Sequence, residues 1–281
     1  MNKLQQLLVI VMATVFASCS SVNTLRNPTT QATLWVQNSA EYEAITTQIY
    51  VTALRMLPLA KEDSYWTAYP EQENTDYSNL PPAIILDVDE TILDNAPFQA
   101  RMIKQGKSYN TEDWNQWASE AKADAIAGAL EFTQYADKED IQLFYITNRE
   151  HDVENPTRKN LEDLGFPVSG GIDNILTKGE RENWTSAKTE RRKFVARNYR
   201  ILMVFGDDLN DFIPAKYISG QERSHLVRDY SAYFGRRWFI LPNPVYGSWE
   251  RAMYDFKDEL SSKEQKQIKI NRLDTKNEEE N

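Results

Sequence analysis

Two aspartates separated by a single residue lie directly after the apolar run 83–86, in the string Asp87-Val88-Asp89-Glu90-Thr91. A carboxylate can attack phosphorus and form an acyl phosphate, which divides one difficult hydrolysis into two easier steps. A second carboxylate nearby can give and take the protons that those steps require. Two carboxylates repel a phosphate dianion, so such a site needs a cation, and Mg²⁺ suits oxygen ligands. Alone, so short a string is a weak signal.

Three further groups of polar residues follow predicted strands or begin a predicted helix. They are Thr147-Asn148-Arg149 after the run 141–146, Lys188 near the start of a helix-like stretch, and Gly206-Asp207-Asp208-Leu209-Asn210-Asp211 after the run 201–205. Each has an ordinary alternative: a solvated turn for Asp207–Asp211, a helix N-cap for Thr147 and a surface helix residue for Lys188. In open α/β sheets, however, functional residues gather at the carboxyl ends of the strands. The joint occurrence of the groups in order favours one site.

The elements that must position these residues are short apolar runs alternating with helical patterns. The predicted strands are 83–86, 141–146, 174–176, 201–205 and 238–241, and the predicted helices are 40–60, 121–136, 155–164, 186–197 and 248–260. Continuous apolar runs are typical of strands buried on both faces. Alternation with helices therefore predicts an α/β fold: a Rossmann-like parallel sheet with helices on both faces, plus a smaller, mainly helical cap.

The two ends of the chain predict processing and a tail. An apolar run of eleven residues, Leu7–Ala17, follows Lys3 and is too short to span a bilayer, which is typical of a signal peptide over 1–18. The next residue is Cys19, and Phe16-Ala17-Ser18-Cys19 resembles the bacterial lipobox, in which this cysteine is lipidated. Its alternative is an incidental or buried thiol.

Between this cysteine and the end of the chain we expect three parts. Residues 19–33 are rich in Ser, Asn and Thr and predict a flexible tether, 34–261 form the folded domain, and the charged segment 262–281 predicts a disordered tail. The domain would include cap elements at about 36–80 and 95–125.

Composition excludes several classes of function. A net charge of −10 argues against binding polymeric nucleic acid, which needs clustered Lys and Arg. The two histidines, His151 and His225, have no motif context, which argues against a His-rich zinc site and a serine-hydrolase triad. A single cysteine allows no intramolecular disulfide.

The four polar groups together resemble the motifs of the haloacid-dehalogenase superfamily, in order and in structural context. The string 87–95 is similar to that of the class C acid phosphatases, the bacterial lipoprotein acid phosphatase/5′-nucleotidase family. Three other segments point the same way: 37–42 at the opening helix, Trp114-Asn115-Gln116-Trp117, and Leu241-Pro242-Asn243-Pro244-Val245-Tyr246-Gly247. The resemblance covers about residues 34–256. Superfamily members that pump ions carry Thr where this chain has Asp89, so the chain resembles the phosphatases and mutases.

The resemblance implies roles for the aspartates. Asp87 would be the nucleophile, and Asp89 would protonate the leaving oxygen and then deprotonate the attacking water. Mg²⁺ would be held by the Asp87 side chain, the Asp89 backbone carbonyl and Asp207, with Asp211 in support.

Other residues would bind the substrate. By the same resemblance, Thr147 and the backbone of Asn148 would hold phosphoryl oxygens, while Lys188 would offset charge on the phosphate and on Asp87. We expect Trp114 and Tyr246 to clamp a nucleotide base, because aromatic stacking accepts any base. The alternative for both is ordinary packing, since the chain has seven Trp and fourteen Tyr.

The expected function is hydrolysis of nucleoside 5′-monophosphates and related small phosphomonoesters outside the cytoplasm, in a nutrient-scavenging role. Lipidation would place the protein in the cell envelope, and Ser20 after the cysteine favours the outer membrane if the source is Gram-negative. One alternative is a non-catalytic surface lipoprotein that binds a nucleotide or haem. Another keeps the chemistry but takes sugar phosphates, phosphotyrosine or a nicotinamide nucleotide. The sequence leaves the oligomeric state open, a homodimer included.

Overall fold

The structure is a computed structural model that describes residues 27–168, 170–257 and 260–276. The predicted signal peptide and Cys19 lie outside the described residues. Within these ranges, no helix combines the length and the apolar character that crossing a membrane requires.

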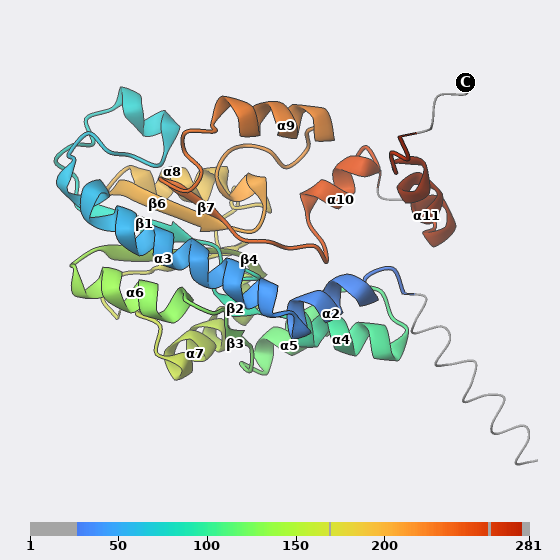
Figure 1. The fold of residues 1–281 in the computed structure, drawn as a ribbon. Helices are drawn as coiled ribbons and strands as arrows, with labels where there is room; N and C mark the ends of the chain where they lie inside the picture. Colours follow the sequence, from blue (N-terminus) through green and yellow to red (C-terminus); the bar gives the residue numbers. More distant parts are fainter. Residues whose placement is uncertain (1–26, 169, 258–259, 277–281) are drawn as a thin grey trace, which may run out of the picture.

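The core of the fold is a five-stranded parallel sheet in the order β5-β4-β1-β6-β7 (Figure 1). Its strands are β1 (Pro82–Leu86), β4 (Gln142–Glu150), β5 (Ile175–Lys178), β6 (Arg200–Gly206) and β7 (Trp238–Ile240). All five predicted strands are confirmed. β4 is longer than expected, so Thr147 lies within the strand rather than after it.

Side chains of the central strand alternate between two apolar cores. Ile84 and Leu86 pack into one cluster, whereas Ala83 and Ile85 pack into the other. This alternation is the two-residue period of a strand buried on both faces. Helices cover both cores, as Figure 1 shows: α3 and α6 lie on one side of the sheet, and α8 and α9 lie on the other.

The covering helices agree in part with the sequence prediction. They are α3 (Ala40–Glu62), α6 (Ala129–Lys138), α7 (Glu154–Leu164), α8 (Thr189–Ala196) and α9 (Gly220–Asp229), with the 3-10 helices η1 (Pro70–Asn74), η2 (His151–Val153) and η3 (Leu209–Asp211). Gly165 ends α7 in the left-handed conformation, as its position predicts.

Helix α3 covers the sheet and is not part of the cap, which corrects the expected cap element at 36–80. Ser39 caps its start by accepting a hydrogen bond from the Tyr42 amide. Midway along it, the buried Tyr50 ring stacks on Phe205 of β6 at 5.4 Å between centroids. At its end, the Arg200 guanidinium donates to the Ala60 and Lys61 carbonyls. A 23-residue helix held at both ends and in the middle fixes one face of the sheet.

The cap proper is smaller and lies beyond the carboxyl end of the sheet (Figure 1). It consists of α2 (Thr30–Asn38), α4 (Ala96–Gln105), α5 (Thr111–Ser119) and the two-stranded antiparallel sheet of β2 (Leu93–Asp94) and β3 (Asp124–Ala125). Trp114 of α5 packs edge-on against Phe98 of α4. The expected cap element at 95–125 matches these helices.

Two predicted helices are shorter than their patterns. The stretch 121–136 is rich in Ala, but Ala121 adopts a left-handed φ of 50° and the following residues form β3, so α6 begins only at Ala129. The stretch 248–260 gives α10 (Ser248–Met253), because Asp255 and Phe256 are left-handed. Local backbone reversals therefore delayed the start of α6 and ended α10 early, at positions that periodicity did not indicate.

The two predicted irregular ends contain helices. Helix α2 begins at Thr30, inside the expected tether, and buries Thr33 and Val36. In the expected tail, α11 (Ser262–Asn271) begins with a capping box between Ser261 and Glu264. Lys269 of α11 also forms an ion pair with Glu250 of α10 at 2.5 Å. The charged composition predicted disorder because these charges were assumed to be solvated, whereas some of them cap and pair.

Gly128 supports a testable prediction about how α3 packs on α6. Gly128 has φ +88°, and an added Cβ would lie 2.9 Å from the Cβ of Tyr50. We expect Gly128→Ala to lower the free energy of unfolding by about 2–5 kcal/mol, from left-handed strain plus overpacking. Gly106→Ala is the matched control, because Gly106 has φ +65° with no atom within 4 Å, so only about 1–2 kcal/mol is expected. Denaturant unfolding measures both, and equal losses would contradict the packing argument.

Candidate active site

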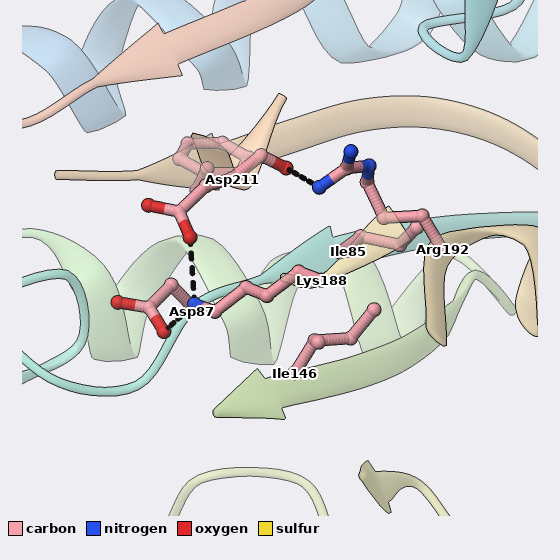
Figure 2. Close-up of a pocket in the computed structure, with 7 residues that line it drawn as sticks. Ile85, Asp87, Ile146, Lys188, Arg192 and Asp211 are labelled. Atoms are coloured by element: carbon pink, nitrogen blue, oxygen red, sulfur yellow. Dashed lines mark hydrogen bonds and ion pairs between the residues drawn. The ribbon is translucent and has the colours of Figure 1, made fainter. Parts of the chain in front are cut away.

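Lys188 joins two aspartates at the carboxyl edge of the sheet. Asp87 directly follows β1, and its amide donates to the Phe205 carbonyl of the neighbouring strand at 3.0 Å. The Lys188 ammonium donates to Asp87 Oδ1 and lies 2.6 Å from Asp211 Oδ1, as Figure 2 shows. All three side chains are buried. The sequence therefore placed Asp87, Lys188 and Asp211 correctly in one site.

A third carboxylate completes the cluster. Oxygen atoms of Asp87, Asp207 and Asp211 all lie within 4.8 Å of one another. Asp207 Oδ2 accepts a hydrogen bond from the Asn243 amide at 2.7 Å. Gly206 permits this crowding, since a Cβ there would lie 2.3 Å from the Cβ of Asp211.

The donor set fits a hard divalent cation. It offers three carboxylates from two strand ends, Asp87 after β1 and both Asp207 and Asp211 after β6, with the buried Lys188 ammonium as counter-charge. Such an excess of buried negative charge is costly unless a cation compensates it. Oxygen-only ligands at this density suit Mg²⁺.

The pKa values in the metal-free protein reflect this crowding. Burial raises the pKa of Asp87 to about 7 and outweighs the lowering by Lys188, while Asp211 and Asp89 raise it further. Burial and then Asp87 also raise the pKa of Asp207 well above its ordinary value. For Lys188, burial acts to lower the pKa, but Asp211 and Asp87 together raise it above the ordinary value. The ammonium is therefore charged, and the carboxylates lack a second cation.

Asp89 is separate from this cluster and is held by its own donors. Arg149 approaches Asp89 Oδ1 with Nε and Nη2, both at 2.9 Å. Asn95 Nδ2 donates to the same oxygen at 3.0 Å, and Thr147 Oγ1 donates to Oδ2 at 3.1 Å. The structure thus brings Asp89 and Thr147 together. The Thr147 hydroxyl, expected to hold a phosphoryl oxygen, is bonded to Asp89 instead.

Two arginines of α8 fix the loops that carry the motifs. Arg191 is fully buried and donates to the Thr147 carbonyl and to Asn148 Oδ1, the latter at 2.7 Å. Arg192 donates to the carbonyl of Asn210 at 2.7 Å. It also donates to the carbonyl of Asp211 at 3.1 Å, as Figure 2 shows. Burial lowers the pKa of Arg191 to about 10, so it stays charged at neutral pH. The Asn148 side chain is engaged in this scaffold, and only its backbone is left for the expected phosphoryl contact.

The two predicted base-clamping aromatics have different surroundings. Trp114 is buried in the main core, and the Arg149 guanidinium lies 5.7 Å from its ring centroid. A ring covered in this way has no face free for a base, so the expectation for Trp114 was wrong. Tyr246 is partly exposed, and its hydroxyl donates to the buried Glu90.

Sequence reasoning missed several residues of the site. Asn95, Arg149, Arg191, Arg192 and Asn243 all bind a motif residue directly. A signal existed for the three arginines. Arg149 adjoins the Thr-Asn motif, and Arg191 and Arg192 stand three and four residues after Lys188, on the same helical face. For Asn95 and Asn243 no spacing pointed to a partner.

Comparisons with known proteins agree with this geometry. Residues 10–249 match the family model described as HAD superfamily, subfamily IIIB (Acid phosphatase). The class C acid phosphatase from Bacillus anthracis has a TM-score of 0.77 and 34% identity, over 88% of this chain and 97% of that chain. The same enzyme with tungstate bound gives a TM-score of 0.76 at 34% identity, with the same coverage of 88% and 97%.

A more distant similarity is found with Acid phosphatase 1 of Solanum lycopersicum, which is 26% identical over 166 residues. The match covers 58% of this chain and 57% of that relative's length. The family model spans most of the chain, from residue 10 to residue 249. The chain therefore belongs to the haloacid-dehalogenase superfamily, subfamily IIIB, the acid phosphatases.

Proposed function

We propose that this chain is a magnesium-dependent phosphomonoesterase that hydrolyses nucleoside 5′-monophosphates and related small phosphomonoesters through an aspartyl-phosphate on Asp87. The observation that carries the proposal is the buried Asp87 carboxylate, which is paired with Lys188 and lies beside Asp207 and Asp211. Phosphoryl transfer requires chiefly charge neutralisation and in-line positioning, and this cluster would supply the neutralising charge through Lys188 and a bound cation.

The chain's own residues divide the work. Asp87 supplies the attacking oxygen, and Lys188 keeps that carboxylate oriented and offsets its charge. Asp89, held outside the cluster by Arg149, would give a proton to the leaving oxygen and later take one from water. Asp87, Asp207 and Asp211 would hold Mg²⁺, which supplies Lewis-acid polarisation of a phosphoryl oxygen when bound.

Fewer observations support the choice of substrate than support the reaction. Membership in the acid phosphatase family supports a phosphomonoester, and the bound tungstate of the Bacillus anthracis relative is an oxyanion of similar shape to phosphate. Tyr246 is the aromatic residue that we propose stacks on a base, since it is partly exposed and its hydroxyl contacts Glu90 of the motif that contains Asp87 and Asp89. A purely binding lipoprotein is the second candidate, but the complete set of expected catalytic residues favours turnover.

We further propose that the protein is lipidated at Cys19 and held at the outer membrane. The support is the apolar run Leu7–Ala17 followed by the lipobox-like string ending at Cys19. Stable attachment needs two or more acyl chains. An enzyme held there would act on phosphate esters before they cross the inner membrane.

Replacing the nucleophile tests the reaction. We expect Asp87→Asn to lower phosphate release from 5′-AMP by at least about a thousandfold, since the neutral amide cannot form the acyl phosphate. Wild-type turnover should need Mg²⁺ and stop with EDTA. Asp163→Asn, at an exposed aspartate paired with Lys159, is the control and should keep full activity. Phosphate release is measured at pH 4 to 9, and no turnover by the folded, Mg²⁺-loaded wild type would promote the binding protein.

The raised pKa of Asp87 predicts a pH-dependent stability for the metal-free protein. Between the ordinary aspartate pKa of about 4 and the folded value of about 7, the folded protein holds a proton that the unfolded chain has released. The free energy of unfolding should therefore fall as the pH rises through this window, by at least about 1 kcal/mol from this group. Urea unfolding in EDTA at pH 5 and pH 8 measures the fall, which should be smaller in Asp87→Asn. Added Mg²⁺ should stabilise the wild type more at pH 8 than at pH 5. An equal fall in wild type and variant would contradict the assignment.

Tyr246 is tested by separating its ring from its hydroxyl. Tyr246→Ala should raise KM for 5′-AMP roughly 5- to 150-fold, the equivalent of about 1–3 kcal/mol of stacking. KM for glycerol phosphate, which has no base, should change little. Tyr246→Phe keeps the ring but loses the bond to Glu90, so it should retain the low KM for 5′-AMP. Equal effects on both substrates in the Ala variant would exclude stacking.

A further inference from the structure

We propose that Asn95, Arg149 and Trp117 are positioning residues that orient the Asp89 carboxyl group for proton transfer. Cap helix α5, which carries Trp117, thereby fixes the orientation of the acid/base group. The inference rests on the proposed function, because it presumes that Asp89 exchanges protons with the leaving group and water. It assigns roles to residues whose side chains bind Asp89 or its partner Asn95, outside the cluster of three carboxylates.

The donors around Asp89 are distributed unequally between its two oxygens. Oδ1 lies within hydrogen-bond distance of three N–H groups, from Arg149 Nε and Nη2 and from Asn95 Nδ2. Oδ2 accepts only from Thr147 Oγ1 at 3.1 Å. An oxygen that already accepts hydrogen bonds from Arg149 Nε and Asn95 Nδ2 has no free lone pair for a proton. The geometry thus assigns the transferred proton to Oδ2, on a side chain that keeps 14% of its surface exposed.

The proton and electron balance is complete with this assignment. In the first step an Asp87 oxygen forms a bond to phosphorus, the bond from phosphorus to the ester oxygen breaks, and the Asp89 Oδ2 proton moves to that oxygen. In the second step Asp89 Oδ2 takes a proton from water, whose oxygen bonds to phosphorus. The bond from phosphorus to Asp87 then breaks and releases phosphate. Oδ1 keeps its hydrogen bonds from Arg149 Nε and Asn95 Nδ2 throughout.

Asn95 connects Asp89 to the cap. Asn95 is fully buried, and its Oδ1 accepts from the Trp117 indole N–H at 2.7 Å and from Arg149 Nη2 at 3.4 Å. Because these donors occupy Oδ1, the amide must present its Nδ2 donor to Asp89. A buried polar group with all its partners in place is a rigid connection.

Arg149 makes the second connection. Its guanidinium is only 1% exposed, donates to Thr157 Oγ1 at 3.1 Å, and lies over the ring of Trp114. Trp114 and Trp117 both belong to α5, so one cap helix supports both groups that hold Asp89 Oδ1. This also explains why Trp114 is buried rather than available to a base.

The test uses the dependence on the leaving group. An aryl phosphate releases a stable phenolate that needs little help from an acid, whereas an alkyl phosphate releases an alkoxide that needs a proton. We expect Trp117→Phe, which removes the indole N–H together with part of the ring, to lower kcat/KM for glycerol phosphate about 10- to 100-fold. We expect it to lower kcat/KM for 4-nitrophenyl phosphate less than about threefold. This constant reports the transfer of the phosphoryl group to Asp87 and excludes the later hydrolysis of the acyl phosphate, which both substrates share. The ratio of the two kcat/KM values is the readout, since a purely structural loss lowers both equally.

Two further variants keep the test decisive. Trp66→Phe is the matched control: its buried indole donates to the Leu202 carbonyl at 2.8 Å, away from Asp89, so its ratio of kcat/KM values should stay at the wild-type value. Arg149→Lys keeps the charge but loses the two-pronged contact, and should shift the ratio as Trp117→Phe does, even if the latter folds poorly.

The outcomes distinguish this inference from the proposed function. If wild type hydrolyses neither substrate with Mg²⁺, or if Asp87→Asn keeps its activity, the proposed function fails. If wild type hydrolyses both and Asp87→Asn neither, the function stands. The positioning inference is then overturned when Trp117→Phe and Arg149→Lys leave the ratio unchanged.

Discussion

Three buried carboxylates lie close together at the carboxyl edge of the sheet and repel one another. The rest of the structure must hold them in place against this repulsion. Asp87, Asp207 and Asp211 share a single ammonium, Lys188, inside a region of low polarity. One positive charge does not neutralise three negative ones, which is why burial raises the pKa of Asp87 to about 7 despite the ion pair. The same deficit makes the cluster a binding site for a divalent cation and a phosphate.

The protein holds these charges in place mainly through backbone carbonyls. Arg191 and Arg192 lie one turn beyond Lys188 on α8, yet among the described residues neither forms an ion pair with a catalytic carboxylate. They bind the carbonyls of Thr147 and of Asn210 and Asp211 instead. A guanidinium with several N–H donors can hold a loop in one geometry, whereas a flexible ammonium suits a charge that must interact with a reacting group. One helix therefore supplies both the rigid framework and the functional cation.

The acid/base residue is kept apart from this cluster by a different network. Asp89 points to Arg149 and Asn95, and these in turn lie against Trp114 and Trp117 of the cap. Separation from the metal-binding carboxylates allows the two aspartates, only two residues apart, to do different chemistry. The cap therefore contacts the acid/base residue through Arg149 and Asn95, besides covering the active site.

The sequence by itself determined the sheet, the membership of the superfamily and the residues that meet at its edge. Apolar runs report strands because burial on both faces leaves no room for polar side chains, and parallel strands must end at one edge. It therefore predicted that Asp87, Lys188, Asp207 and Asp211 would converge. Local patterns did not reveal the left-handed reversal at Ala121, or the pairing of Lys269 with Glu250 that accompanies helix α11 in the expected tail.

Only the tertiary structure decided which side chains face one another across the chain. Asn95 and Trp117 are 22 residues apart, and Asn95 and Arg149 are 54 apart, so no helical or strand period relates them. Trp114 illustrates the reason. A tryptophan can stack on a base or fill a core equally well, and here the ring packs in the core against the Arg149 guanidinium. Periodicity records which face of an element is buried, whereas the partner on that face depends on how all the elements pack together.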